Sequence, residues 1–63
     1  MTNPHLEELT ERAKNLQAEI TLLRGQAARY TAEGETAWSV RVSLQLIDRQ
    51  ARLEEITGFL QAS

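Results

Sequence analysis

The sequence predicts an α+β fold in which a long helix is followed by a short β-hairpin and a second helix. Three observations favour this fold: an apolar stripe with helical spacing near the N-terminus, strict apolar–polar alternation in the middle, and a second helical pattern towards the C-terminus. Residues 1-63 are expected to form a single domain, because a chain of 63 residues is too short to build two hydrophobic cores.

The first helix is expected to run from Pro4 to Arg24. Asn3 can cap it, and Pro4 suits a first turn, where the missing N–H has no helical partner to lose. Gly25 is predicted to end it. Its apolar residues recur at a 3-4-3-4-3 spacing and form one narrow stripe: Leu6, Leu9, Ala13, Leu16, Ile20 and Leu23.

The middle of the chain has two interpretations. Alternation of apolar and polar residues from Trp38 to Leu46 predicts a half-buried strand. A turn over residues 31–34, with Gly34 in the left-handed conformation, would join it to a first strand that contains Ala28 and Tyr30. The alternative is an all-α two-helix hairpin, in which the first helix continues through Tyr30 and the chain reverses near residues 33–35.

The alternative places apolar residues on two opposite faces of the second helix. One face would carry Val40, Leu44, Ile47 and Ala51, and the other would carry Val42, Leu46, Leu53 and Leu60. A helix of this kind needs a partner on each face, whereas a strand that turns into a helix near Ser43 needs only one core. This difference favours the strand.

The last segment is predicted to be a helix with Ser43 as its N-cap. Its apolar edge contains Leu46, Leu53, Ile56 and Leu60, widened by Ile47 and Ala51. Gly58 is expected to end or loosen this helix. Phe59 and Leu60 are expected to fold back onto the first helix, with a docking role as the alternative.

Composition excludes several classes of protein. The net charge is −2 without a clustered basic face, so direct binding of nucleic acid is not expected. No signal peptide is expected, and no stretch is apolar enough to cross a membrane, which predicts a soluble protein that stays in the compartment where it is made. Cysteine is absent, so disulfides cannot support so small a domain, and self-association or a protein partner is the expected stabiliser.

No catalytic, metal-binding or cofactor-binding residues are predicted, and the protein is expected not to be an enzyme. His5 is interpreted as a surface histidine, and the acidic pairs at Glu7-Glu8 and Glu54-Glu55 as solvated helix faces. Ser39 and Ser43 have no histidine base to activate them. No cofactor is expected.

The order of helix, glycine, hairpin and capped helix resembles the phage lambda W-like head–tail joining proteins. The resemblance covers about residues 5–58 and lies in the sequences LRG at 23–25, YTAEGE at 30–35 and LEEITG at 53–58, with 38–42 as the second strand. It implies an α-β-β-α layout and a homo-oligomeric virion component that docks as a ring under the portal and receives a tail-side protein. The expected location is then the host cytoplasm, followed by the virion.

Two hypotheses about function follow. In the first, the chain is a head–tail joining subunit, and Arg29 and Arg41 of the hairpin contact acidic helix faces of a neighbour. In the alternative, it is a small helical-hairpin regulator or adaptor that dimerises through the stripe from Leu6 to Leu23 and binds a protein partner. Both hypotheses make it a protein that works by docking onto other protein subunits.

Overall fold

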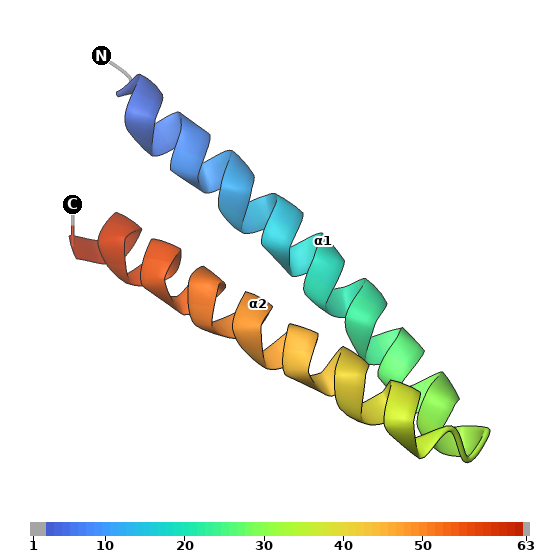
Figure 1. Cartoon of the computed structure of the whole chain (residues 1–63). Helices are drawn as coiled ribbons and strands as arrows, with labels where there is room; N and C mark the ends of the chain where they lie inside the picture. Colours follow the sequence, from blue (N-terminus) through green and yellow to red (C-terminus); the bar gives the residue numbers. More distant parts are fainter. Residues whose placement is uncertain (1–2, 63) are drawn as a thin grey trace.

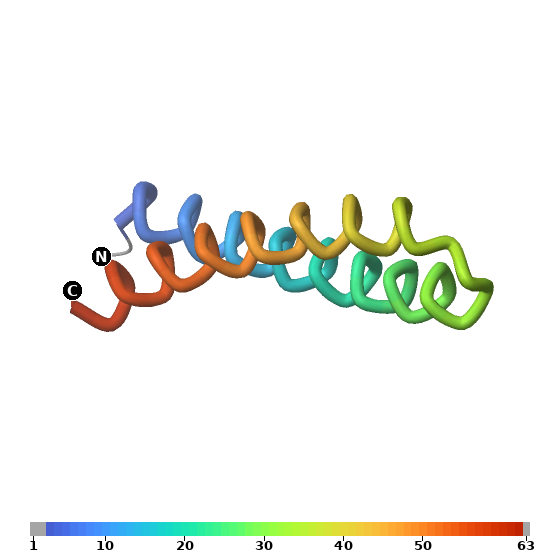
Figure 2. The backbone as a smooth tube through the Cα atoms, turned by 60° about the horizontal axis from the view of Figure 1, so that its bottom comes forward, coloured from blue at the N-terminus to red at the C-terminus, as the bar shows by residue number. Residues whose placement is uncertain are grey.

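A computed structural model describes residues 3–62 and contains two antiparallel helices, α1 from Pro4 to Ala32 and α2 from Thr36 to Ala62. The helices form one elongated hairpin with principal extents of 51 × 15 × 12 Å (Figure 1). Both ends of the described chain lie at the end of the hairpin opposite the turn. Figure 2 shows that α1 and α2 cross along their length, so each helix wraps partly around the other.

The predicted α+β fold is wrong: residues 3–62 contain no strand, and the all-α two-helix hairpin is what the structure shows. The first helix does not stop at Arg24 and Gly25, because α1 continues for seven residues beyond Gly25. A glycine inside a helix costs only about 1 kcal/mol relative to alanine. The apolar pattern that continues through Ala27 and Tyr30 outweighs that cost.

The alternation between Trp38 and Leu46, interpreted as a strand, is part of α2. Ser43 lies in the interior of this helix and is not its N-cap, and α2 also runs through Gly58 without ending. Alternating apolar residues fit a helix when both of its faces are apolar, as Val42 and Leu44 illustrate by pointing to opposite sides. α2 is therefore the helix with two apolar faces, the structure that the predicted strand was preferred to.

The contact between the helices is a seam with a seven-residue repeat on both sides. On α1 the seam residues are Leu6, Leu9, Ala13, Leu16, Ile20, Leu23, Ala27 and Tyr30, and on α2 they are Ser39, Val42, Leu46, Arg49, Leu53, Ile56 and Leu60. All are buried or half-buried, and Ile20, Leu23 and Val42 are the most buried, at 5–7% exposed. Apolar residues repeated at this spacing pack as in an antiparallel coiled coil.

The start of α1 follows the prediction. The Asn3 side chain accepts a hydrogen bond from the backbone N–H of His5 at 2.9 Å, and Pro4 is the first helical residue. The cap satisfies one of the N–H groups that the first turn leaves without a helical partner.

The turn depends on Gly34, whose φ of 76° is the left-handed conformation predicted for it. The turn is a helix C-cap and not a β-turn: the N–H of Glu35 donates to Tyr30 O at 2.8 Å, and the N–H of Gly34 donates to Thr31 O at 3.1 Å. These two bonds form the motif with which glycine ends many helices. The backbone N–H of Ser39 then donates to Glu35 O at 2.9 Å and begins α2.

Candidate protein-interaction surface

The seam leaves a second apolar stripe of α2 uncovered. Val40 is 54% exposed, and Leu44 and Ile47 are each 62% exposed. With two exposed alanines they complete a 3-4-3-4 spacing, and we call these five residues the outer stripe: Ala37, Val40, Leu44, Ile47 and Ala51. The seam and the outer stripe lie on opposite sides of α2 because successive residues of a helix are 100° apart.

Charged and polar residues flank the outer stripe. On one side lie Arg41 and Asp48, one heptad apart, and on the other lie Ser43 and Gln50. The Asp48 carboxylate accepts a hydrogen bond from Nη1 of Arg49 and lies 3.3 Å from Nε of Arg52, one turn further along α2. The stripe is therefore bounded by one side that carries charge of both signs and one side that is neutral and polar.

One ion pair crosses the seam itself. Arg49 occupies a seam position, with its side chain 29% exposed, and its Nε donates to Glu19 Oε1 at 2.8 Å. This hydrogen bond and the charge of Glu19, followed by the contact with Asp48, raise the pKa of the Arg49 guanidinium above its ordinary value. Arg49 therefore stays charged and joins the two helices near the middle of the hairpin.

Aromatic and cationic side chains gather close to the turn. The rings of Tyr30 and Trp38 stack with centroids 6.2 Å apart and an interplanar angle of 28°. The Arg41 guanidinium carbon lies 5.0 Å from the centroid of the Trp38 ring, within the range of a cation–π contact. Thr31 and Ser39 share a hydroxyl–hydroxyl hydrogen bond of 2.7 Å beside this stack. These contacts tie the end of α1 to the start of α2.

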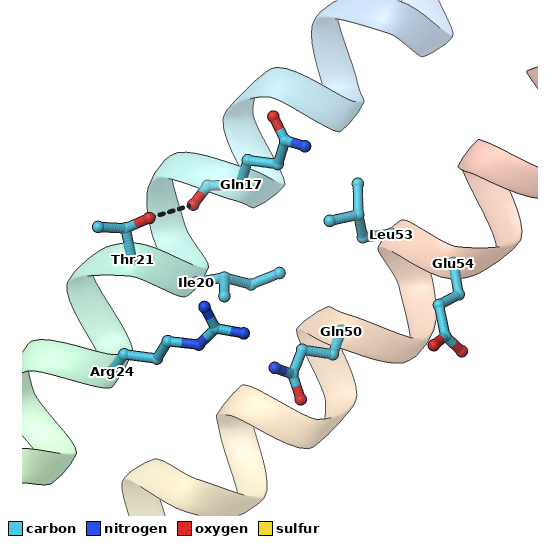
Figure 3. A pocket seen from close by; sticks show the side chains of 7 residues that line it. All are labelled: Gln17, Ile20, Thr21, Arg24, Gln50, Leu53 and Glu54. Carbon is cyan, nitrogen blue, oxygen red and sulfur yellow. Dashed lines mark hydrogen bonds between the residues drawn. The ribbon is translucent and has the colours of Figure 1, made fainter.

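A polar groove runs along one edge of the seam (Figure 3). Ile20 and Leu53 of the two facing helices are its apolar members, and Thr21 Oγ1 donates to the backbone oxygen of Gln17 at 3.0 Å. The remaining lining residues are Arg24, Gln50 and Glu54. The one hydroxyl in this lining, that of Thr21, is donated to the backbone of its own helix.

The residues that were considered as candidates for catalysis or metal binding lie apart from one another. His5 is in the first turn of α1, where its ring meets that of Phe59 edge-on at 6.0 Å. The acidic residues at positions 7, 8, 54 and 55 are all exposed. Within residues 3–62, no group of three or more histidine, cysteine, aspartate or glutamate residues is arranged to hold a metal ion.

The residues named in the two docking hypotheses also lie in places other than those expected. Arg29 and Arg41 are not on a hairpin of strands: Arg29 is in the last turn of α1, and Arg41 is on α2 beside the outer stripe. The stripe from Leu6 to Leu23, expected in the alternative hypothesis to join two copies, is covered by α2 of the same chain. Arg49 was not predicted as a seam residue, although it follows Val42 by seven residues, one full heptad.

Over the described part of the chain, neither helix is long and apolar enough to cross a membrane. No known protein family, curated protein or solved structure matches the sequence or the fold of this chain.

Proposed function

We propose that this chain is a non-enzymatic helical-hairpin adaptor that works by docking the outer stripe of α2 onto a protein surface. The observation that carries the proposal is the exposure of Leu44 and Ile47, each 62%, on a helix whose opposite face is already packed against α1. A helix that is apolar on both sides is typical of a buried position, and α2 is covered on one side only. Contiguous exposed apolar residues of this kind mark interaction sites.

The proposal keeps the general content of both earlier hypotheses, which is docking onto other protein subunits. The head–tail joining role relied on a layout with two strands, and residues 3–62 have none, so that role stays a prediction without support from the fold. The hairpin adaptor fits the two helices directly. The proposed contact surface differs from the one first expected. The stripe of α1 is covered by α2, so the proposal uses the outer stripe of α2 instead.

A lipid surface fits the outer stripe less well than a protein does. Helices that lie on membranes combine an apolar face with a polar face rich in lysine and arginine. α2 has no lysine, and its three arginines are balanced by three acidic residues: Asp48, Glu54 and Glu55. The side of α2 opposite the outer stripe is also occupied by α1 and cannot act as a solvated polar face.

Site-specific photocrosslinking tests the proposal. A photoreactive phenylalanine analogue at position 44 should crosslink to protein in cells that produce the chain, and Ile47→Glu in the same chain should abolish the product. The matched control places the analogue at position 22, because Leu22 is equally exposed at 62% but lies on α1, outside the outer stripe. No product from position 44, equal products from both positions, or a product that survives Ile47→Glu would contradict the proposal.

A further inference from the structure

We infer that the outer stripe is covered by the outer stripe of a second copy, with the two α2 helices antiparallel at the centre of a homodimer. The inference rests on the proposed docking function and specifies its partner. In this dimer each α2 has an apolar partner on both faces, α1 of its own chain on one side and α2 of the other copy on the opposite side.

The apolar layers define one register. In antiparallel coiled coils, residues at the two alternating seam positions face each other across the contact. For the outer stripe this places Leu44 opposite Ile47 of the second copy, and Val40 opposite Ala51 of the second copy. Each contact occurs twice by the two-fold symmetry, because a two-fold interface uses the same patch on both subunits. The four layers that these residues form are apolar, and two of them pair a larger side chain with alanine. Ala37, at the edge of the outer stripe, lies level with Glu54 of the second copy.

The flanking charges support the same register. The geometry that places Leu44 opposite Ile47 also places Arg41 of each copy opposite Asp48 of the other, giving two symmetric pairs of opposite charge. The neutral flank places Ser43 opposite Gln50, whose side chains can share a hydrogen bond. Charges arranged in this complementary way select a register and a partner. Arg41 and Asp48 of the same chain are about 10 Å apart along α2, so they do not pair within one copy. Arg49 and Arg52 of the same chain both contact Oδ2 of Asp48, which leaves Oδ1 to accept from Arg41 of the second copy.

Neighbouring antiparallel registers are disfavoured by the same residues. A shift of one heptad in one direction keeps apolar layers, Ala37 with Ile47 and Val40 with Leu44, but places Arg41 opposite Arg41 of the second copy. A shift in the other direction places Asp48 opposite Asp48 and Leu44 opposite Glu54. Each shift therefore brings like charges together, and the second also replaces two apolar layers by layers that contain a carboxylate. The chosen register is the one that combines four apolar layers with pairs of opposite charge.

A parallel pairing is disfavoured by the turn. The basic and acidic residues of α1 balance, as do those of α2, so the net charge of −2 comes from Glu33 and Glu35. A parallel dimer places the two turns side by side and gathers four carboxylates at one end. The antiparallel dimer separates the two turns by about 34 Å along the helix axis, because Gly34 of one copy lies level with Thr57 of the other. The two α2 helices in contact each have a net charge of zero, so the copies do not repel each other.

Sedimentation equilibrium of the purified full chain tests the dimer. The stripe is short and the interface is small, so we expect a dissociation constant on the order of micromolar. Leu44→Glu should weaken association at least tenfold, while the equally exposed Leu22→Glu should leave it unchanged. Circular dichroism should show that both variants remain helical, since both positions are exposed in the hairpin. A chain that stays monomeric up to millimolar concentration, or a dimer that is insensitive to Leu44→Glu, would overturn the inference.

A charge-reversal cycle tests the register. Arg41→Glu and Asp48→Arg should each raise the dissociation constant, by roughly threefold to tenfold, and the double variant should restore most of the loss. Rescue is expected only between copies, because the two positions are too far apart to pair in one chain. Additive losses in the double variant would exclude this register.

Disulfide trapping tests the orientation, and the absence of native cysteine makes its products unambiguous. When Val40→Cys and Ala51→Cys proteins are mixed and oxidised, the antiparallel dimer should give the mixed 40–51 disulfide. The 40–40 distance is then about 16 Å, too long for a disulfide. A parallel dimer would give the 40–40 and 51–51 products and would overturn the inference. A monomeric purified chain that still crosslinks from position 44 to a different protein would overturn the homodimer but leave the docking function standing.

Discussion

Nε of Arg49 donates to Glu19 Oε1 at 2.8 Å, and this contact joins residues 30 positions apart in the sequence across the seam of the hairpin. Arg49 stands at a position where the repeat of α2 otherwise provides mostly apolar side chains. A charged group at a seam position restricts which register of two helices is acceptable, because a shifted register would separate it from its partner. The pair therefore helps to align α2 on α1.

Arg49→Lys should make the stability of the hairpin sensitive to alkaline pH. Glu19 raises the pKa of Arg49 in the folded chain. The stability that the ion pair contributes is therefore fully present below the pKa that the arginine has in the unfolded chain. It is lost only as the pH rises through the higher pKa of the folded chain, which lies beyond ordinary conditions. Lysine has an ordinary pKa of about 10.4, so the introduced lysine, paired with Glu19, should lose its stabilisation as the pH rises above about 10.4. Melting temperatures between pH 7 and pH 11 measure the difference.

The control for this prediction is the same pH series on Glu19→Gln combined with Arg49→Lys. Without the carboxylate, the pKa of the introduced lysine has no cause to rise, and the additional alkaline loss should disappear. An equal alkaline slope in the native chain and in Arg49→Lys would show that the Glu19 contact does not contribute to folding.

Ile20→Ala and Leu22→Ala should have very different effects although the residues are two positions apart. Ile20 is 5% exposed in the seam, and truncation of a buried isoleucine to alanine typically costs about 2–5 kcal/mol. Leu22 is 62% exposed, and its truncation should change the free energy of unfolding by no more than about 0.5 kcal/mol. A core of this size rarely supplies more than about 3–5 kcal/mol, so Ile20→Ala should lose a large part of the total stability. Urea unfolding followed by circular dichroism gives both values, and equal losses would contradict the seam.

Substitutions at Gly34 and Gly25 should have effects of opposite sign. Gly34 has a φ of 76°, a conformation that costs residues with a Cβ roughly 1–2 kcal/mol, so Gly34→Ala should destabilise the hairpin. Gly25 is inside α1, and a Cβ there meets nothing within 4 Å, so Gly25→Ala should stabilise it by up to about 1 kcal/mol. Thermal unfolding of the two variants beside the native chain measures this. If Gly25→Ala destabilised, the continuity of α1 through this residue would be in doubt.

The sequence contained enough information for the start of α1 and for the conformation of Gly34, but not for the other helix ends or for the choice between strand and helix. The Asn3 cap and the left-handed Gly34 were predictable because each depends on a few neighbouring residues. The alternation around Val42 and Leu44 was not decisive, because it fits a strand with one buried face and equally a helix with two apolar faces. The choice depends on α1 covering one face of α2 along its whole length, which is a tertiary effect that local patterns do not contain.

The same ambiguity explains why the outer stripe was not predicted to be an interaction surface. The opposed stripes of α2 were visible in the sequence, and the outer stripe contains the four residues that were assigned to one of them: Val40, Leu44, Ile47 and Ala51. The need for a second partner was used as an argument against a helix. In the structure the helix is present, so that need becomes the strongest indication of an interaction surface. Arg49 remained hidden because the repeat was followed through apolar residues only.

Tyr30→Ala should shift the fluorescence of Trp38 to longer wavelength. The Tyr30 ring stacks on Trp38 with centroids 6.2 Å apart, and Trp38 is already 50% exposed, so removal of the tyrosine ring should open the indole further to water. A stacked aromatic pair contributes about 0.5–1.5 kcal/mol beyond its buried area, so the melting temperature should fall as well. Because the chain has a single tryptophan, the emission reports this end of the hairpin alone. Phe59→Ala, at the opposite end of α2, is the matched control and should leave the emission maximum of the folded chain unchanged. An emission maximum unaffected by Tyr30→Ala would mean that the two rings do not stack in solution and that the turn is held mainly by its backbone hydrogen bonds.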